Sequence, residues 1–203
     1  MRRSSFMKLS HSAITIIIMT ILGGMALFFA RSPFAAPTAP LQGAKATMLD
    51  RKPSGSTLTQ QEVKVLLQGH NRARAEVGVG PLRWSKQLAN YAQEWATHLA
   101  LTKCGFEHRP DTGEWRREHG ENLFMGTAGY YGVADAVKAW VDEKIYYKGE
   151  TLTAGNFHAS GHYTQVVWKD TKEVGCAKAE CKGNIIVVCN YDPPGNVIGR
   201  KPY

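Results

Sequence analysis

Four polar side chains in this sequence could do chemistry together if the fold brings them to one place. His108 lies in CGFEHRP beside a cysteine, Glu121 follows the first residue of GENLFMG, Glu143 lies in WVDEKIYY, and His162 lies in SGHYTQVVW. An imidazole can be a metal ligand, a catalytic base or a buried hydrogen-bonding group. Taken singly, such residues are usually structural or solvated. What they do therefore depends on the elements that position them.

The first positioning element is a helix that begins after Thr59. Thr59 and Glu62 fit a capping box, in which each side chain accepts a hydrogen bond from the backbone of the other residue. We expect the helix to end before Gly78, near a Gly-Pro pair. Its core-facing positions have helical spacing and include Val63, Leu66, Leu67, His70, Asn71 and Arg74.

Two more helices and a short strand are expected in the middle of the chain. The second helix begins at Ser85 and buries Leu88, Tyr91, Ala92, Trp95, Ala96 and Leu99. The third buries Val133, Ala136, Val137, Trp140 and Val141. GENLFMG, between them, is the strand, so Glu121 lies near its start and Glu143 at the edge of the third helix.

The end of the chain predicts a hairpin. Residues 174–181 alternate loosely, Lys182-Gly183-Asn184 supplies a turn, and IIVVC (185–189) is apolar without alternation. A strand without a polar face is covered on both sides. Helices before and between such strands predict an α+β fold, a three-layer α-β-α sandwich with a small antiparallel sheet.

The cysteines favour disulfides over a metal site. Their even number suits two disulfides in an oxidising compartment. Zinc is the competing interpretation, but spacings of five and eight residues match no structural zinc pattern. The four residues are Cys104, Cys176, Cys181 and Cys189.

The pairing follows from the hairpin register. Cys176 and Cys181 are an odd number of residues apart, so they face opposite sides of one strand and cannot pair. A turn centred on Lys182-Gly183 sets Cys176 opposite Cys189 and leaves Cys104 for Cys181. Turn chemistry prefers a turn one residue further along, which would separate Cys176 from Cys189.

Composition and charge fit one globular domain with an N-terminal extension. The chain has 203 residues, 43% of them hydrophobic and 21% charged, which is enough to bury a core. Residues 1–40 hold four basic and no acidic residues, which leaves 21 basic against 17 acidic residues, a net charge of +4, in the remainder. Without a Lys/Arg block or an aromatic-interleaved basic patch, we expect no nucleic-acid partner.

The N-terminus predicts export. Residues 1–31 place basic residues before an uncharged run from Ala13 to Ala30, which is typical of a signal peptide or a signal anchor. Either one carries the rest of the chain across the membrane. Residues 32–57, rich in Pro, Ala, Ser, Thr and Gly, predict a flexible linker, followed by a domain at 58–203. We expect that domain to be secreted, or anchored to a membrane on its outer side.

Four blocks of the sequence are HNRAR (70–74), GENL (120–123), GHYTQVVWKDT (161–171) and VVCNYDPPGN (187–196). They resemble the signature blocks of the CAP superfamily, which comprises cysteine-rich secretory proteins, insect venom antigens and plant pathogenesis-related proteins. RARAEVGVGPLRW, WVDEKIYY and PPGNVIGRKPY are similar to the plant pathogenesis-related branch in particular. That branch typically has two more cysteines just before GHYTQ. ETLTAGNFHASGHY has none, so we expect a more mobile loop there.

The resemblance implies an α-β-α sandwich with a cleft that holds His108, Glu121, Glu143 and His162. This donor set suits a borderline divalent ion such as zinc, which some members of the family hold. The alternative is that the four groups bond one another and water. His70 is implied to be a core hydrogen-bonding residue. The resemblance gives no role to the histidines His98, His119 and His158.

The resemblance also implies a function in binding. Members of the family capture sterols or other lipids, and Tyr146, Tyr147 and Phe157 border the variable loop, where they could line a groove or anchor the core. The alternatives are a metal-dependent hydrolase or protease, and a precursor whose C-terminal peptide is released as a defence signal. No nucleophile is indicated, so we assign no catalytic residue. We expect a monomeric binding module, associated with a membrane if it is anchored, with a sterol or other lipid as its partner.

Overall fold

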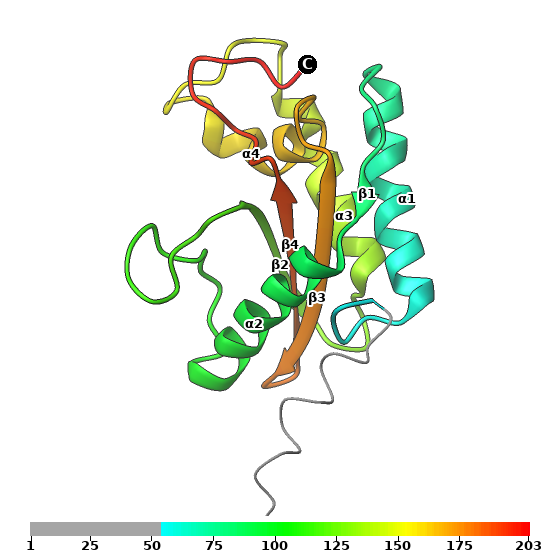
Figure 1. Cartoon of the computed structure of the whole chain (residues 1–203), viewed down its shortest axis with the longest axis vertical. Helices are drawn as coiled ribbons and strands as arrows, with labels where there is room; N and C mark the ends of the chain where they lie inside the picture. Colours follow the sequence, from blue (N-terminus) through cyan, green and yellow to red (C-terminus); the bar gives the residue numbers. More distant parts are fainter. Residues whose placement is uncertain (1–53) are drawn as a thin grey trace, which may run out of the picture. The chain divides into compact units, whose positions relative to one another are not determined.

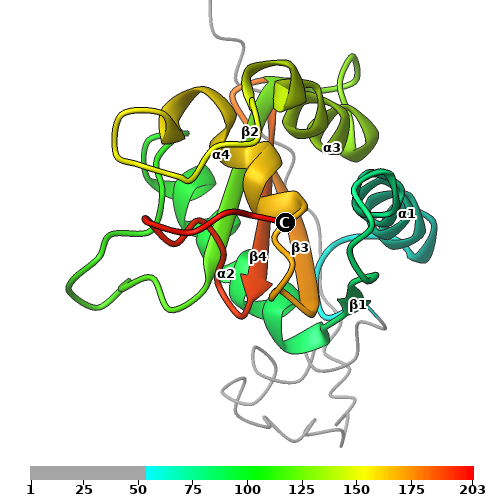
Figure 2. The ribbon, with the colours of Figure 1, turned by 90° about the horizontal axis from the view of Figure 1, so that it is seen from above.

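The computed structural model describes residues 54–203, so the expected leader (1–31) and residues 32–53 of the expected linker lie outside the described part. The elements are α1 (Gln60–Glu76), β1 (Arg83–Trp84), α2 (Lys86–Thr102), β2 (Gly120–Thr127), α3 (Val133–Asp142), the 3₁₀ helix η1 (Glu143–Tyr146), α4 (Phe157–Val166), β3 (Glu173–Cys181) and β4 (Asn184–Asp192). Figure 1 and Figure 2 show α2 on one side of the sheet and α1 and α3 on the other. Within residues 54–203, the structure contains no helix that combines the length and the apolar character of a membrane span.

The sheet has the strand order β1-β3-β4-β2. β4 is antiparallel to both β2 and β3, as the hairpin predicts. β1 is parallel to β3 and pairs Arg83 with Glu173 and Trp84 with Val174. The sheet is thus antiparallel except for this two-residue strand, which is too short for any periodicity to indicate it.

The sheet separates two hydrophobic cores, and β4 contributes to both. Val187, Cys189 and Tyr191 belong to the core under α1, α3 and α4, whereas Ile186 and Val188 belong to the core under α2. All five side chains are buried. The prediction from IIVVC of a strand covered on both faces is therefore confirmed.

The hairpin turn settles the disulfide pairing. Lys182 and Gly183 both have positive φ, 47° and 76°, the conformation of a type I′ two-residue turn. This register places Cys176 opposite Cys189, and these two residues form a disulfide. A second disulfide joins Cys104 to Cys181, so the loop after α2 is tied to the end of β3.

The start of α1 is capped as the sequence predicts, and its core face carries a buried histidine. The Thr59 side chain accepts from Glu62 N, and Glu62 accepts from Thr59 N. His70 Nδ1 donates to Leu66 O at 2.8 Å, and His70 Nε2 accepts from the Tyr191 hydroxyl at 2.8 Å. Burial lowers the pKa of His70 from 6.5 to about 4. The residue is therefore a neutral core group, as the resemblance implied.

Arg74 joins α1 to the end of α4. Its buried guanidinium donates to four carbonyl oxygens, those of Gly80, Val166, Trp168 and Thr171. Val166 is the last residue of α4, so Arg74 supplies a positive charge where unpaired carbonyls and the helix dipole favour one. Burial lowers the pKa of Arg74 to about 10, which still leaves it charged at neutral pH.

The described part of the chain begins with packed residues. Ser54 and Ser56 are buried, and the Ser54 carbonyl accepts from Trp84 Nε1 at 2.9 Å. Thr57 N donates to Gln93 Oε1 at 2.8 Å. The last four residues of the expected linker therefore pack against the domain.

Candidate functional site

A cleft of about 680 Å³ lies where three segments meet. Gly120 at the start of β2 pairs with Tyr191 near the end of β4, so the loop before β2 and the tail after β4 leave the sheet at one end. α4 and the red C-terminal tail lie at that end in Figure 1. The lining includes His108, Glu121, Phe157, His158, His162, Pro194 and Ile198.

His108 is oriented by a buried carboxylate. Glu121 Oε1 accepts from His108 Nδ1 at 2.8 Å and from the backbone N–H of Arg109 at 3.0 Å. The second oxygen accepts from Asn190 Nδ2 at 3.4 Å. A carboxylate that accepts from Nδ1 keeps the proton on that nitrogen, so the neutral ring has its lone pair on Nε2.

His162 is held in the same way by Glu143, the first residue of η1. Glu143 Oε1 accepts from His162 Nδ1 at 2.6 Å. Its other oxygen accepts from the backbone N–H groups of His162 and Tyr163, at 2.9 and 3.3 Å. α4 is interrupted at Ser160, which has a non-helical φ of −136°. His162 therefore lies in the first turn of a new helical segment, where a carboxylate satisfies free N–H groups.

The four expected site residues thus form two histidine–glutamate pairs. His108, Glu121 and His162 line the cleft, and Glu143 lies behind His162. Each glutamate occupies the Nδ1 side of its imidazole, away from Nε2. Within residues 54–203, no group of three or more His, Cys, Asp or Glu side chains is placed to hold one metal ion. In this geometry each glutamate orients a histidine, which fits the alternative that these four groups bond one another.

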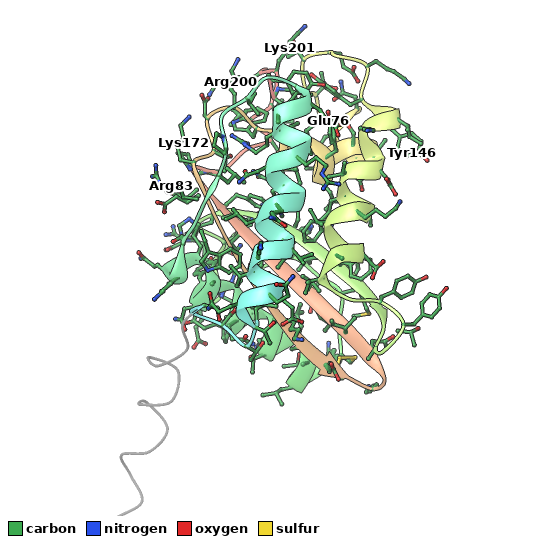
Figure 3. All side chains as sticks on the ribbon, turned by 90° about the vertical axis from the view of Figure 1, so that its right-hand side faces the viewer. Glu76, Arg83, Tyr146, Lys172, Arg200 and Lys201 are labelled. Carbon is green, nitrogen blue, oxygen red and sulfur yellow. A yellow bond between two sulfur atoms is a disulfide. The ribbon has the colours of Figure 1, made fainter. Side chains whose placement is uncertain are left out.

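The three expected lipid-contacting aromatics are not brought together. Phe157 lines the cleft. Tyr147 is buried and its hydroxyl donates to Glu150 O at 2.8 Å, so it belongs to the core. Tyr146 is 57% exposed and lies at the outer edge of the molecule in Figure 3.

Gln165, which the sequence does not single out, packs between two signature blocks. Its buried side chain accepts from Gly195 N–H at 3.0 Å. A Cβ atom at Gly120 would lie 2.3 Å from Gln165 Oε1, and one at Gly195 would lie 2.7 Å from Gln165 Nε2. A side chain at either position would displace Gln165 from this place. The glycines of GENL and PPGN are the signal that could have indicated a side chain packed between them.

The tail after β4 is fastened to α4 and forms one wall of the cleft. Asn196 Nδ2 donates to Gly161 O at 2.8 Å, and Asn196 Oδ1 accepts from Thr164 Oγ1 at 2.7 Å. The tail also pairs with the loop before α4, since Leu152 N donates to Arg200 O and Gly199 N donates to Leu152 O. These contacts join the tail to the loop that was expected to be more mobile because it has no cysteines.

The comparisons with known proteins agree with the blocks and the fold. The model of the cysteine-rich secretory protein family, CAP, matches residues 67–191. Pathogenesis-related protein 1C of Nicotiana tabacum is 46% identical over 74% of this chain and 86% of its own length. The chain belongs to the CAP family. Pathogenesis-related protein 1 of Arabidopsis thaliana is 44% identical to this CAP protein, over 68% of this chain and 80% of its own.

Solved CAP structures share the fold. The crystal structure of NaASP2 with Zn²⁺ is 27% identical, with a TM-score of 0.63, and covers 72% of this chain and 86% of its own. The structure of BmVAL-1 is 28% identical, with a TM-score of 0.62, and covers 73% and 84%. The α-β-α sandwich expected from the sequence is thus confirmed.

Proposed function

We propose that this CAP protein is an exported, defence-related binding module whose cleft takes a sterol or other lipid and, at its polar end, a divalent metal ion such as zinc. One observation carries the proposal: a single cavity combines an apolar wall with two oriented imidazoles. Its volume of about 680 Å³ falls within the range of about 300–1,000 Å³ that is usual for small-molecule sites.

The lipid part of the proposal rests on the apolar part of the cleft. Phe157 from α4 and Pro194 and Ile198 from the tail line it, so an amphipathic molecule could place its apolar body there and its polar group near the imidazoles. Of the three aromatics expected from the sequence, Phe157 alone lines this cavity. We therefore assign the lipid to the histidine cleft and not to a separate groove.

Lipid extraction of the purified full-length protein, followed by mass spectrometry and a sterol titration, tests this assignment. We expect Phe157→Ala to weaken sterol binding about tenfold, because a buried aromatic contact is worth about 1–2 kcal/mol of binding. Tyr146→Ala, which removes an exposed aromatic outside the cleft, is the matched control and should bind as the wild type does. A larger loss of sterol binding in Tyr146→Ala than in Phe157→Ala would instead assign the lipid site to η1.

The residues fit a metal that takes few protein ligands. Carboxylate–histidine–metal arrangements fix the imidazole tautomer and make Nε2 a better ligand, and both cleft histidines carry such a carboxylate. Two imidazoles leave further positions to water or a bound ligand, unlike a closed structural zinc site with four protein ligands. A zinc ion held there would polarise a ligand oxygen. The solved relative NaASP2 is a structure with Zn²⁺.

Zinc titration of the full-length protein by calorimetry tests the metal part. His108→Ala and His162→Ala should each abolish measurable binding, whereas Glu143→Gln should weaken it about 10–100-fold. His158→Ala is the matched control, because His158 also lines the cleft but is not assigned to the metal. Equal losses in the control and in His162→Ala would refute this ligand assignment.

A double variant separates the binding module from the enzyme. Replacing Glu121 and His162 by Ala should remove zinc binding but leave sterol binding largely intact, provided that the unfolding midpoint shows a folded protein. A metal-dependent hydrolase would behave differently. Hydrolysis that disappears in His162→Ala, and returns when zinc is added to stripped wild-type protein, would replace our proposal.

Export is proposed from residues 1–31, with support from the disulfides at Cys104–Cys181 and Cys176–Cys189, which persist in oxidising compartments. A reporter that works only outside the cytoplasm, fused after Tyr203, should be active. Full signal from a reporter restricted to the cytoplasm would contradict export.

The alternative of a released C-terminal peptide is constrained by the packing of the tail. Pro202 is buried, and its carbonyl accepts from Lys169 N–H at 2.7 Å. Since Pro194 and Ile198 line the cleft, release of residues 193–203 would open it. A chain that ends at Asp192 should therefore lose sterol binding. Unchanged binding by that chain would show that the tail is no part of the ligand site.

A further inference from the structure

A second hollow, of about 520 Å³, lies along the outer side of α2 and shares no lining residue with the cleft. Most of its lining comes from one side of α2, and Trp115 of the loop before β2 completes it. We call it the α2 groove. Its lining residues are Asn90, Gln93, Glu94, Thr97, His98, Leu101, Thr102 and Trp115.

The aromatic cluster behind the α2 groove already holds a cation. The Arg109 guanidinium carbon lies 3.8 Å from the ring centroid of Tyr91, 5.3 Å from that of Trp115 and 5.5 Å from that of Trp95. All three distances fall within the range of about 6 Å at which a ring face attracts a cation. The Arg109 side chain is 3% exposed, so these rings stabilise a desolvated positive charge.

The groove extends this aromatic cluster to the surface. The rings of His98 and Trp115 lie 4.6 Å apart, and Leu101 beside them is 81% exposed. Together these side chains give the groove an apolar, partly aromatic wall. An apolar ligand body could cover them.

One carboxylate lines the α2 groove. Glu94 lines it with a side chain that is 53% exposed, and none of the lining residues is a Lys or Arg. Arg109 approaches Glu94 at 3.6 Å but donates its shorter bond, of 2.6 Å, to the Tyr91 carbonyl. The carboxylate therefore keeps an exposed side on which it can accept a second cation.

We propose that the α2 groove is a second binding site, and that it takes a small organic cation with an apolar body, such as an alkylated ammonium. A quaternary ammonium group suits aromatic faces because it is attracted to them and loses little hydration. The ammonium would lie between Glu94 and the ring of Trp115, and the apolar part would cover Leu101. This site is independent of the cleft and of its proposed ligands.

Choline and its neutral isostere 3,3-dimethylbutanol are the probes for this site. Titrated into the full-length chain, choline should shift the indole N–H resonance of Trp115 in NMR spectra, with affinity in the millimolar range or tighter. The neutral isostere should bind at least fivefold more weakly. Equal binding of the two compounds would overturn the assignment to a cation.

Two variants locate the binding. Glu94→Gln and Trp115→Leu should each weaken choline binding about fivefold or more. Glu118→Gln removes another exposed carboxylate of the same region, outside the groove, and should bind as the wild type does. Glu94 is exposed, so its variant tests the proposal even if Trp115→Leu fails to fold. Choline binding that leaves the Trp115 resonance unmoved, or that Glu94→Gln does not change, would refute the site.

Discussion

The two segments that carry the cleft histidines are held by different means. His108 belongs to the segment between α2 and β2, residues 103–119, which forms no helix or strand. The Cys104–Cys181 disulfide ties this segment to β3, and Arg109, stacked on Tyr91, ties it to α2. His162 belongs to α4, where no disulfide forms and where side chains from four other segments hold the helix through hydrogen bonds.

The difference follows from how each segment satisfies its own backbone. A loop without regular structure has few internal hydrogen bonds, so a covalent bond and a buried cation–aromatic stack limit its conformations. A helix satisfies most of its own backbone but leaves its ends open. α4 has ten residues and a break at Ser160, so groups such as Glu143 and Arg74 complete its ends. One wall thus has a covalent bond in addition to its hydrogen bonds, whereas the other is fastened by hydrogen bonds alone.

The largest effect is expected from Arg74, the anchor of the hydrogen-bonded wall. Arg74→Met removes four hydrogen bonds. The Trp168 oxygen still accepts from Thr171 N–H and Gly80 is exposed, but the Val166 and Thr171 oxygens lose their donor, and each unsatisfied buried group costs about 1–3 kcal/mol, in addition to about 0.5–1.5 kcal/mol for each of the other two bonds. We expect the free energy of unfolding to fall by about 4–6 kcal/mol, as measured by urea denaturation. Arg72→Met, an exposed change on the same helix, should cost less than about 0.5 kcal/mol. Similar losses in the two variants would contradict the anchoring role.

The next effect concerns the covalently fastened wall. Replacing Cys104 and Cys181 by Ala removes a bond between residues 77 positions apart, and loop-closure entropy predicts a loss of about 4.5 kcal/mol. The imidazole resonances of His108 should broaden or shift, whereas those of His162 stay in place. His162 is thus an internal control. Equal disturbance of both histidines would show that the two walls are not independently held.

A third effect is a pH dependence of stability that arises in the core and not in either wall of the cleft. The His70 pKa is lowered to about 4 by burial first and by the Arg74 charge, against an ordinary value of 6.5. Between those pH values the unfolded chain takes up a proton that the folded chain does not. The contribution of His70 to the free energy of unfolding is therefore fully present above pH 6.5 and is lost as the pH falls towards 4. The loss is about 3 kcal/mol.

Comparison with His70→Gln isolates this contribution. The variant should be less stable than the wild type at pH 7, and the gap between the two should shrink by about 3 kcal/mol at pH 4, because the wild type alone carries this penalty. His98→Gln, a change at a partly exposed histidine outside the network, is the control. A gap that stays constant with pH would show that His70 titrates normally in the folded protein.

The sequence predicts the elements of the fold better than the directions of the side chains at the site. Thr59, Ser85 and IIVVC carry strong local signals, and the helix caps and the doubly covered strand appear where these predict them. Tyr146 and Tyr147 illustrate what local signals omit. They are adjacent in sequence, but the end of η1 sends Tyr146 outwards and Tyr147 into the core. In so short an element no periodicity indicates which side chain is buried.

The site itself shows the same limit. The sequence and the resemblance identify two histidines and two glutamates, and the structure brings them together as pairs. Whether Glu121 and Glu143 act as ligands or as orienting groups depends on which side of each ring they occupy. That side is set by the break at Ser160 and by the course of the loop that carries His108. Both are tertiary features without a local sequence signal.

The smallest expected effect tests a single contact of the hydrogen-bonded wall. Asn196 has a φ of 57°, so Asn196→Gly keeps the backbone conformation without strain and removes only the bonds to Gly161 and Thr164. Two lost hydrogen bonds should cost about 1–2 kcal/mol in the free energy of unfolding, and sterol binding should weaken because the tail leaves its place in the cleft.

Lys182→Gly is the matched control, since Lys182 also has positive φ and its side chain makes only an exposed contact with Lys103. That change should be neutral or slightly stabilising. If both glycine variants respond alike in urea denaturation, the side chain of Asn196 does not fasten the tail, and the polar network of this wall must rest on Arg74 and Glu143.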